Sequence, residues 1–143
     1  MKGKFWLIRI FSKFHEGLYR FSRGRIGTKI GNLQFIILTT TGRKSGKKRV
    51  VPLASIPSGK EYMVIASYGG NSHHPAWFLN LRENPNIEIQ IGTRITKAKA
   101  SIVEKTDSLY QELWGKATAT YHGFDNYQKA TSRNIPIVII KPY

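Results

Sequence analysis

The chain has no cysteine among its 143 residues. This absence excludes a disulfide scaffold, a thiolate nucleophile, an iron–sulfur cluster and a cysteine-ligated zinc site. Of the four histidines, His73 and His74 are adjacent but have few acidic neighbours, so we interpret them as part of a loop and expect no metal site. The apolar runs are far shorter than the roughly 20 residues that a membrane-spanning helix needs.

Acidic residues are also scarce, since 8 Asp and Glu face 23 Lys and Arg and the net charge is +15. The excess is local, because residues 1–60 hold 14 of the basic residues and one acidic residue. A local positive field attracts nucleic acid, an acidic membrane surface or an acidic small molecule. We find no pattern of a common nucleic-acid-binding motif, so we expect no nucleic-acid partner.

The N-terminal segment, residues 4–21, predicts a basic amphipathic helix. Its apolar side chains recur at steps of three and four residues, the spacing of one helix face, at Leu7, Ile10, Phe14, Leu18 and Phe21. Such a helix either packs on its own core or lies on an anionic membrane surface. Arg9 interrupts the apolar stretch, which disfavours a secretory signal. We therefore expect a protein of the cytoplasm, or one held peripherally on the inner membrane face.

The rest of the chain predicts one α+β domain at residues 33–143, after a helix and a basic Gly-rich linker at residues 1–32. Alternating or β-branched runs predict six strands, at residues 33–41, 49–56, 61–67, 86–91, 94–103 and 136–140. Pro57–Lys60 is expected to be a turn. Helices are expected at residues 76–81, 106–121 and 124–132, the second capped by Thr106 or Asp107. Tight turns between successive strands favour a six-stranded, mostly antiparallel barrel with covering helices.

Two of the segments that could carry chemistry are rich in glycine. Gly42-Arg-Lys-Ser-Gly46 forms a hairpin tip that could hold an anion with backbone N–H groups and cationic side chains, or could be only a solvated basic turn. It lacks the spacing of a P-loop. Ala66-Ser-Tyr-Gly-Gly70 follows a strand, and its small residues allow a flat ring to approach the backbone, although such a sequence also suits an ordinary strand exit.

Two further segments are aromatic. The short helix after Pro75 carries Trp77 and Asn80, which could shape a pocket or simply plug the core. Tyr121 and Tyr127 lie six residues apart around Gly123, and two phenols near one pocket could donate hydrogen bonds or a proton. Lone tyrosines are more often packing residues.

In this order and at these spacings the segments resemble the deazaflavin-dependent nitroreductase family, split β-barrel oxidoreductases that use coenzyme F420. The resemblance runs from about Phe35 to Pro142. It rests on Leu38–Gly46, Arg49 with Pro52-Leu53, Val64–Ser67 with Gly69-Gly70, Pro75-x-Trp77 with Asn80-Leu81 and Asn84-Pro85, and Ile135–Val138.

The resemblance implies hydride transfer from the reduced coenzyme to a quinone, a nitro compound or a similar acceptor. It implies that the hairpin tip binds the phosphate and acidic tail of the coenzyme through Arg43, Lys44, Ser45, Gly46, Lys48 and Arg49. The ring pocket is implied to be formed by Pro52, Ala66, Ser67, Tyr68, Gly69, Gly70, Trp77 and Asn80. Ser67, Tyr121 and Tyr127 are the implied catalytic residues.

Two positions depart from the best-studied members of that family, which carry Tyr at the position of Phe124 and Lys at the position of Tyr68. The alternatives left open are an enzyme using flavin mononucleotide on the same barrel, and a carrier of the deazaflavin or of a lipid without catalytic activity. A nucleic-acid-binding module is the least favoured reading. The sequence leaves the oligomeric state open.

Overall fold

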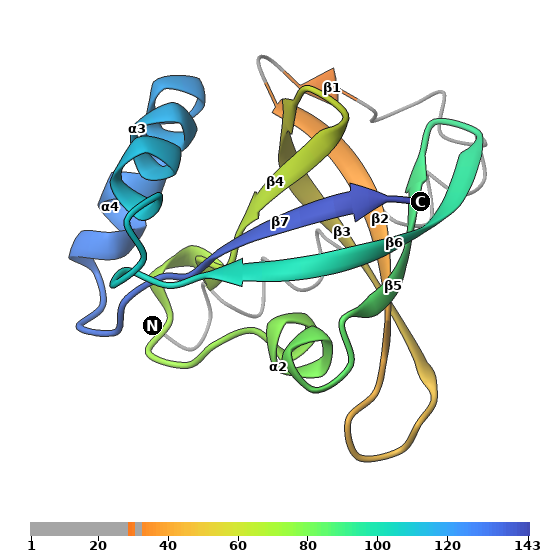
Figure 1. Ribbon diagram of the computed structural model, residues 1–143. Helices are drawn as coiled ribbons and strands as arrows, with labels where there is room; N and C mark the ends of the chain where they lie inside the picture. Colours follow the sequence, from red (N-terminus) through yellow and green to blue (C-terminus); the bar gives the residue numbers. More distant parts are fainter. Residues whose placement is uncertain (1–28, 31–32) are drawn as a thin grey trace.

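A computed structural model describes residues 29–30 and 33–143 of the chain (Figure 1). The strands in these residues are β1 (Lys29–Ile30), β2 (Leu33–Thr41), β3 (Lys48–Ser58), β4 (Glu61–Ile65), β5 (Asn86–Ile91), β6 (Arg94–Val103) and β7 (Ile137–Pro142). The helices are α2 (Ala76–Glu83), α3 (Tyr110–Thr120) and α4 (Gly123–Lys129), with a 3₁₀ turn, η1, at Tyr68–Gly70. The predicted helix at residues 4–21 lies outside the described residues.

Six of the strands close into an antiparallel barrel, which confirms the expected fold class. The sheet runs β2-β3-β4-β7-β6-β5, and β5 pairs back onto β2 through Ile37–Gln90, Leu38–Ile89 and Thr39–Glu88. The short β1 pairs with the first residues of β2, so two residues of the expected linker join the sheet. In Figure 1 the β2–β3 hairpin extends beyond the body of the barrel, close to α2.

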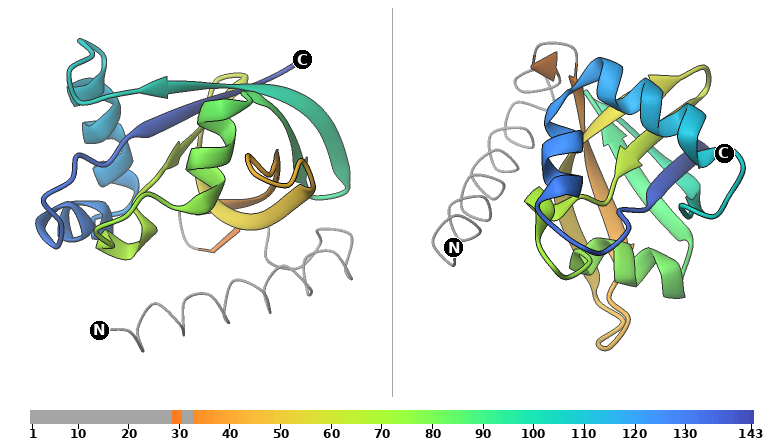
Figure 2. Two further views of the ribbon diagram at one scale, coloured as in Figure 1. Left: turned by 90° about the horizontal axis from the view of Figure 1, so that it is seen from below. Right: turned by 90° about the vertical axis from the view of Figure 1, so that its left-hand side faces the viewer.

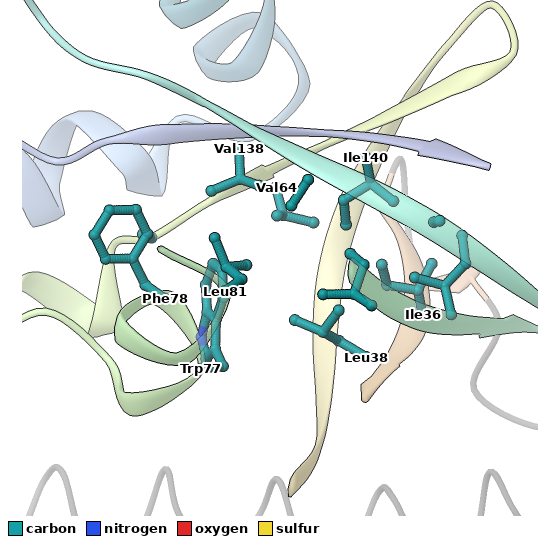
Figure 3. Close-up of a cluster of buried hydrophobic side chains, with 13 residues drawn as sticks. Ile36, Leu38, Val64, Trp77, Phe78, Leu81, Val138 and Ile140 are labelled. Atoms are coloured by element: carbon teal, nitrogen blue, oxygen red, sulfur yellow. The ribbon is translucent and has the colours of Figure 1, made fainter. Parts of the chain in front are cut away.

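The barrel interior is filled by alternate strand residues and by α2. Ile36 and Leu38 of β2 point into the same buried cluster as Val138 and Ile140 of β7, as the two-residue period of a strand requires. From α2, Trp77, Phe78 and Leu81 enter this cluster (Figure 3). The predicted short helix therefore does plug the core, and its buried face fixes the orientation of the residues beside it.

A second apolar cluster joins the outside of the barrel to α3 and α4. Met63 and Ile65 of β4 belong to this outer cluster, whereas Val64 between them belongs to the inner one. Residues 63–65 are continuously apolar because both faces of the strand are covered. The Tyr110 hydroxyl donates a hydrogen bond to the backbone oxygen of Ile135, which attaches α3 to the start of β7. Figure 2 shows α3 and α4 packed together on one side of the barrel.

Several element boundaries differ from those predicted. β3 continues through Pro57, which pairs with Tyr62, so the turn is only Gly59-Lys60, with Gly59 at a φ of 64°. α3 begins at Tyr110, because the Asp107 carboxylate accepts from the N–H of Leu109 and caps the preceding turn instead of the helix. β4 ends at Ile65 before the predicted end of that strand. α4 spans 123–129 and ends three residues before its predicted end, whereas β7 spans 137–142 and continues two residues beyond its predicted end.

Within residues 29–30 and 33–143, no helix has the length and hydropathy needed to cross a membrane.

Candidate functional site

A cavity of about 1030 Å³ lies where the β2–β3 hairpin, η1, α2 and the α3–α4 junction meet. This volume is at the upper end of what ligand pockets usually have, about 300–1,000 Å³. All four segments singled out in the sequence contribute to its wall. The sequence-predicted site residues that line it are Arg43, Lys44, Ser45, Arg49, Pro52, Ser67, Tyr68, Gly69, Trp77, Asn80, Tyr121 and Tyr127.

Four sequence-predicted site residues do not line the cavity. Ala66 is fully buried in the barrel core. A Cβ at Gly70 would lie 2.8 Å from the Cβ of Ala130, so this glycine allows η1 to pack against α4. Gly46 closes the hairpin tip by donating to the oxygen of Gly42 at 2.8 Å. Lys48 is exposed on the hairpin, outside the cavity wall.

The basic end of the cavity is fixed by the buried amide of Asn80, which is 3% exposed. Its Oδ1 accepts from the backbone N–H of Arg43 at 3.2 Å and from Nη1 of Arg43 at 2.9 Å. Its Nδ2 donates to the Thr40 hydroxyl at 3.2 Å. One side chain of α2 thus connects the core-filling helix to both the strand and the tip of the hairpin, so the hairpin is more than the solvated turn that composition alone allowed.

Ser67 is a buried polar residue of the cavity wall whose donors have no partner in the described part of the chain. It is 9% exposed, and neither its hydroxyl nor its backbone N–H has a hydrogen-bond partner among the described residues. Its carbonyl oxygen accepts from the N–H of Gly70 at 2.9 Å and from Arg133 at 2.8 Å. Since buried polar groups are almost always paired, two donors on a cavity wall without a partner in the described residues are available to a bound ligand.

The segment after Ser67 has an unusual backbone. Tyr68 has a φ of 46°, in the left-handed region that side chains other than glycine rarely adopt, and Gly69 and Gly70 follow at 62° and 81°. Strained residues of this kind cluster at functional sites. The three left-handed residues reverse the chain immediately after β4 and keep Tyr68 and Gly69 on the cavity wall.

The opposite end of the cavity is aromatic. The hydroxyls of Tyr121 and Tyr127 are 3.2 Å apart, and Phe124 lies edge-on to Tyr121 with ring centroids 5.1 Å apart. Burial, and secondly the hydrogen bond shared with Tyr121, raise the pKa of Tyr127 to about 12. Both effects keep the Tyr127 phenol protonated at neutral pH, as a hydrogen-bond donor must be.

Sequence reasoning missed Arg133, which belongs to none of the motifs. Its guanidinium donates to the backbone oxygens of Ala66, Ser67 and Asn71, at 3.1, 2.8 and 2.8 Å, and its Nη1 lies 3.1 Å from Nδ1 of His74. These partners lie about 60 residues earlier in the chain, so no local pattern signals them. The apolar wall on β3, which includes Val51 and Leu53, was also missed.

Comparison with known proteins identifies the family of this chain. A family model described as F420H(2)-dependent quinone reductase matches residues 11–142. The chain belongs to this family. It is therefore an oxidoreductase that uses coenzyme F420 and transfers hydride from the reduced coenzyme to a quinone. The family resemblance drawn from the sequence is confirmed, and neither flavin mononucleotide nor a carrier role is supported by the match.

Individual relatives agree with the family. The chain is 35% identical over 130 residues to the F420H(2)-dependent quinone reductase Rv1261c of Mycobacterium tuberculosis, covering 90% of this chain and 87% of the relative. A solved F420-H2 dependent reductase, FDR-A, is 34% identical, with a TM-score of 0.65 over 75% of this chain and 93% of its own. A structure titled domain-swapped dimer is 30% identical, with a TM-score of 0.70 over 90% of this chain and 96% of that chain.

The residues of the cavity fit the coenzyme of this family. Arg43, Lys44 and Arg49 place cationic groups at one end, where an anionic tail needs them. The unsatisfied Ser67 donors and the apolar β3 wall suit a flat ring with carbonyl oxygens.

We predict that Asn80→Ala lowers the free energy of unfolding by about 1–3 kcal/mol, because the backbone and side chain of Arg43 and the hydroxyl of Thr40 all lose a partner. Urea denaturation measures the change. Asn126→Ala, at an exposed position of α4, is the control and should stay within about 0.5 kcal/mol of the parent protein. Equal stability of both variants would contradict the anchoring role of Asn80.

Proposed function

We propose that the cavity is the active site of the family reaction, with the coenzyme tail at the hairpin, its ring beside Ser67, and the quinone beside Tyr121 and Tyr127. The observation that carries this proposal is the pair of unsatisfied donors of Ser67, lying in one cavity that has cations at one end and phenols at the other. A ligand that is acidic at one end and flat at the other matches this order of groups.

The cationic end would bind the phosphate and acidic tail. Arg43 is held by Asn80, so its planar guanidinium is fixed before binding and less side-chain entropy is lost. Lys44 and Arg49 line the cavity without a side-chain hydrogen bond to the described part of the protein, which leaves their donors for an anion. Lys48, outside the cavity wall, adds to the positive field without touching the tail.

The aromatic end would hold the acceptor. When bound, the reduced coenzyme supplies a hydride, and reduction of a quinone to a hydroquinone needs one proton in addition. Tyr121 is 38% exposed and shares a hydrogen bond with the protonated Tyr127, so this phenol pair can donate to a quinone oxygen and recover the proton from solvent. Phe124 supplies an apolar surface and no third donor. This arrangement suits the quinone acceptor of the family.

Removing the cationic side chains of Lys44 and Arg49 tests the proposed binding site of the coenzyme tail. The double variant Lys44→Ala, Arg49→Ala should bind coenzyme F420 about tenfold or more weakly, measured by fluorescence quenching at fixed salt, because two charge-assisted contacts are lost. The matched control is Lys97→Ala, Lys99→Ala, which removes the same charge from exposed positions of β6. A similar loss in both variants would show that net charge, and not this site, governs binding.

Gly123 offers a test of the phenol pair that leaves Tyr121 in the chain. A Cβ at this position would overlap the Tyr121 ring, while alanine is otherwise the better helix residue. We expect Gly123→Ala to displace the phenol and lower kcat for quinone reduction about tenfold, to a similar level as Tyr121→Phe, with coenzyme affinity unchanged. Stopped-flow oxidation of the reduced coenzyme measures the rate. Full activity of both variants would remove Tyr121 from the mechanism.

We further propose that residues 4–21 hold the enzyme on an anionic membrane surface, where lipid-soluble quinones are found. The support is the basic, amphipathic pattern of this segment. We predict that the full chain binds vesicles containing phosphatidylglycerol more tightly than neutral vesicles, and that Arg9→Gln, Lys13→Gln, Arg20→Gln lowers this binding about tenfold in a sedimentation assay. Lys97→Gln, Lys99→Gln, Lys105→Gln is the control for charge. Unchanged binding by the N-terminal triple variant would refute the proposal.

A further inference from the structure

Arg133 does not line the cavity, but its guanidinium contacts residues 66–67, 71 and 74, which lie next to the site. Two of its bonds reach the backbone oxygens of Ala66 and Ser67, one reaches Asn71, and one reaches the ring of His74. None of these four partners is a carboxylate. The guanidinium is partly buried, and this burial lowers the pKa of Arg133. The partly buried guanidinium of Arg133 thus bonds mainly to backbone oxygens, and such bonds are suited to fixing a backbone conformation.

The conformation that it fixes is the one that exposes the donors of Ser67. In a trans peptide the C=O and the following N–H point in opposite directions. Arg133 draws the oxygens of Ala66 and Ser67 toward itself, so the N–H of Ser67 points away from the guanidinium. This N–H and the Ser67 hydroxyl are the donors that find no partner among the described residues. We call the hydrogen bonds of Arg133 to residues 66–74 the Arg133 clamp. The clamp lies next to the left-handed residue Tyr68, whose strained backbone conformation must be stabilised by surrounding contacts.

Contacts from α4 and from α2 hold the two ends of the Arg133 clamp in place. Gln128 of α4 donates to the backbone oxygen of Arg133 at 2.8 Å and accepts from the N–H of Ile135 at 3.1 Å, which fixes the loop between α4 and β7. His74 lies directly before Pro75 and packs against Phe78, with the rings tilted and their centroids 4.8 Å apart. Arg133 therefore couples the ring-binding segment to α2, the helix whose Asn80 holds the hairpin.

We propose that Arg133 is the positioning residue of the ring site, holding residues 66–74 in the one arrangement in which Ser67 presents its N–H and hydroxyl to the coenzyme ring. The proposal rests on the function proposed above. Arg133 touches neither coenzyme nor acceptor and acts through the Ser67 backbone. Its loss therefore affects ring placement and hydride transfer, and leaves the tail contacts at the hairpin intact.

Arg133→Gln tests this role, with Arg133→Lys as the conservative variant and Arg94→Gln as the control. Arg94 is an exposed arginine at the start of β6 and does not line the cavity. Single-turnover oxidation of the reduced coenzyme by a short-chain benzoquinone should slow about tenfold or more in Arg133→Gln, because small misplacements of reacting groups cost large factors in rate. Affinity for the whole coenzyme should change less than about threefold, since its tail is still held. Arg94→Gln should retain the parent rate.

Hydrogen exchange supplies a readout that does not need activity. Amides of residues 66–71 should exchange about tenfold faster in Arg133→Gln, while those of β2 stay protected. Arg133→Lys, which keeps one charge but loses the planar fork, should fall between the parent and Arg133→Gln in both rate and exchange.

A pH profile separates positioning from general stability. Burial, and then the charges of Arg133 and Arg82, lower the pKa of His74, while Glu104 raises it. His74 is thus neutral at pH 7 and its Nδ1 can accept from Arg133. The contact is lost as pH falls through the lowered pKa of His74, below its ordinary value of 6.5, because protonated His74 has no acceptor at Nδ1 and repels Arg133. Protection of the amides of residues 66–71, corrected for the intrinsic exchange rate at each pH, should therefore fall on acidification in the parent protein and stay unchanged in His74→Asn, which keeps an acceptor without the titration.

The outcomes distinguish the two proposals. If the parent protein oxidises the reduced coenzyme with benzoquinone and Arg133→Gln keeps both its rate and its protection at residues 66–71, the positioning role is wrong. If the parent protein neither binds nor oxidises the coenzyme, the proposed function fails first. Faster exchange in Arg133→Gln would then still show that Arg133 holds this segment. A uniform loss of protection across the barrel would assign Arg133 to stability alone and overturn the proposal.

Discussion

The pairing of β5 onto β2 is the constraint on which the rest of this structure depends. It involves three residue pairs, Ile37–Gln90 to Thr39–Glu88, but it turns an open sheet into a closed barrel. Closure removes the exposed edges of the sheet and creates an interior that α2 must fill. Once Trp77, Phe78 and Leu81 occupy that interior, the polar side of α2 is fixed against the β2–β3 hairpin. The site is assembled on this scaffold.

Two polar side chains convert the packed scaffold into a shaped cavity. Asn80 bridges α2 and the hairpin tip, and Arg133 bridges the segment after β4 and the loop before α2. Each side chain forms hydrogen bonds with several groups that lie far from it in the sequence. Each is also at least partly shielded from water, and in such surroundings a hydrogen bond is stronger and its loss is more destabilising. The cations and phenols of the cavity are comparatively exposed, as groups that must meet a ligand and solvent are.

The sequence predicted the elements because their patterns are local. Strict alternation in residues 86–91, and the β-branched run at 33–41, led directly to β5 and β2. The four polar segments were found for the same reason, since their glycines, cations and phenols lie close together in the chain. The start of α3 was misplaced because both Thr106 and Asp107 are good capping residues, whereas in the structure Asp107 caps the turn before the helix and α3 begins at Tyr110.

By itself the sequence determined the antiparallel barrel and which segments line the cavity, because strand periodicity, turn residues and local charge are properties of neighbouring residues. Only the tertiary structure decided which side chains of those segments face the cavity. Lys48 and Ala66 lie within the right motifs but point elsewhere, whereas Arg133 belongs to no motif and holds the site. The physical reason is that orientation depends on barrel closure and on hydrogen bonds between residues about 40 to 65 positions apart, which no local pattern encodes.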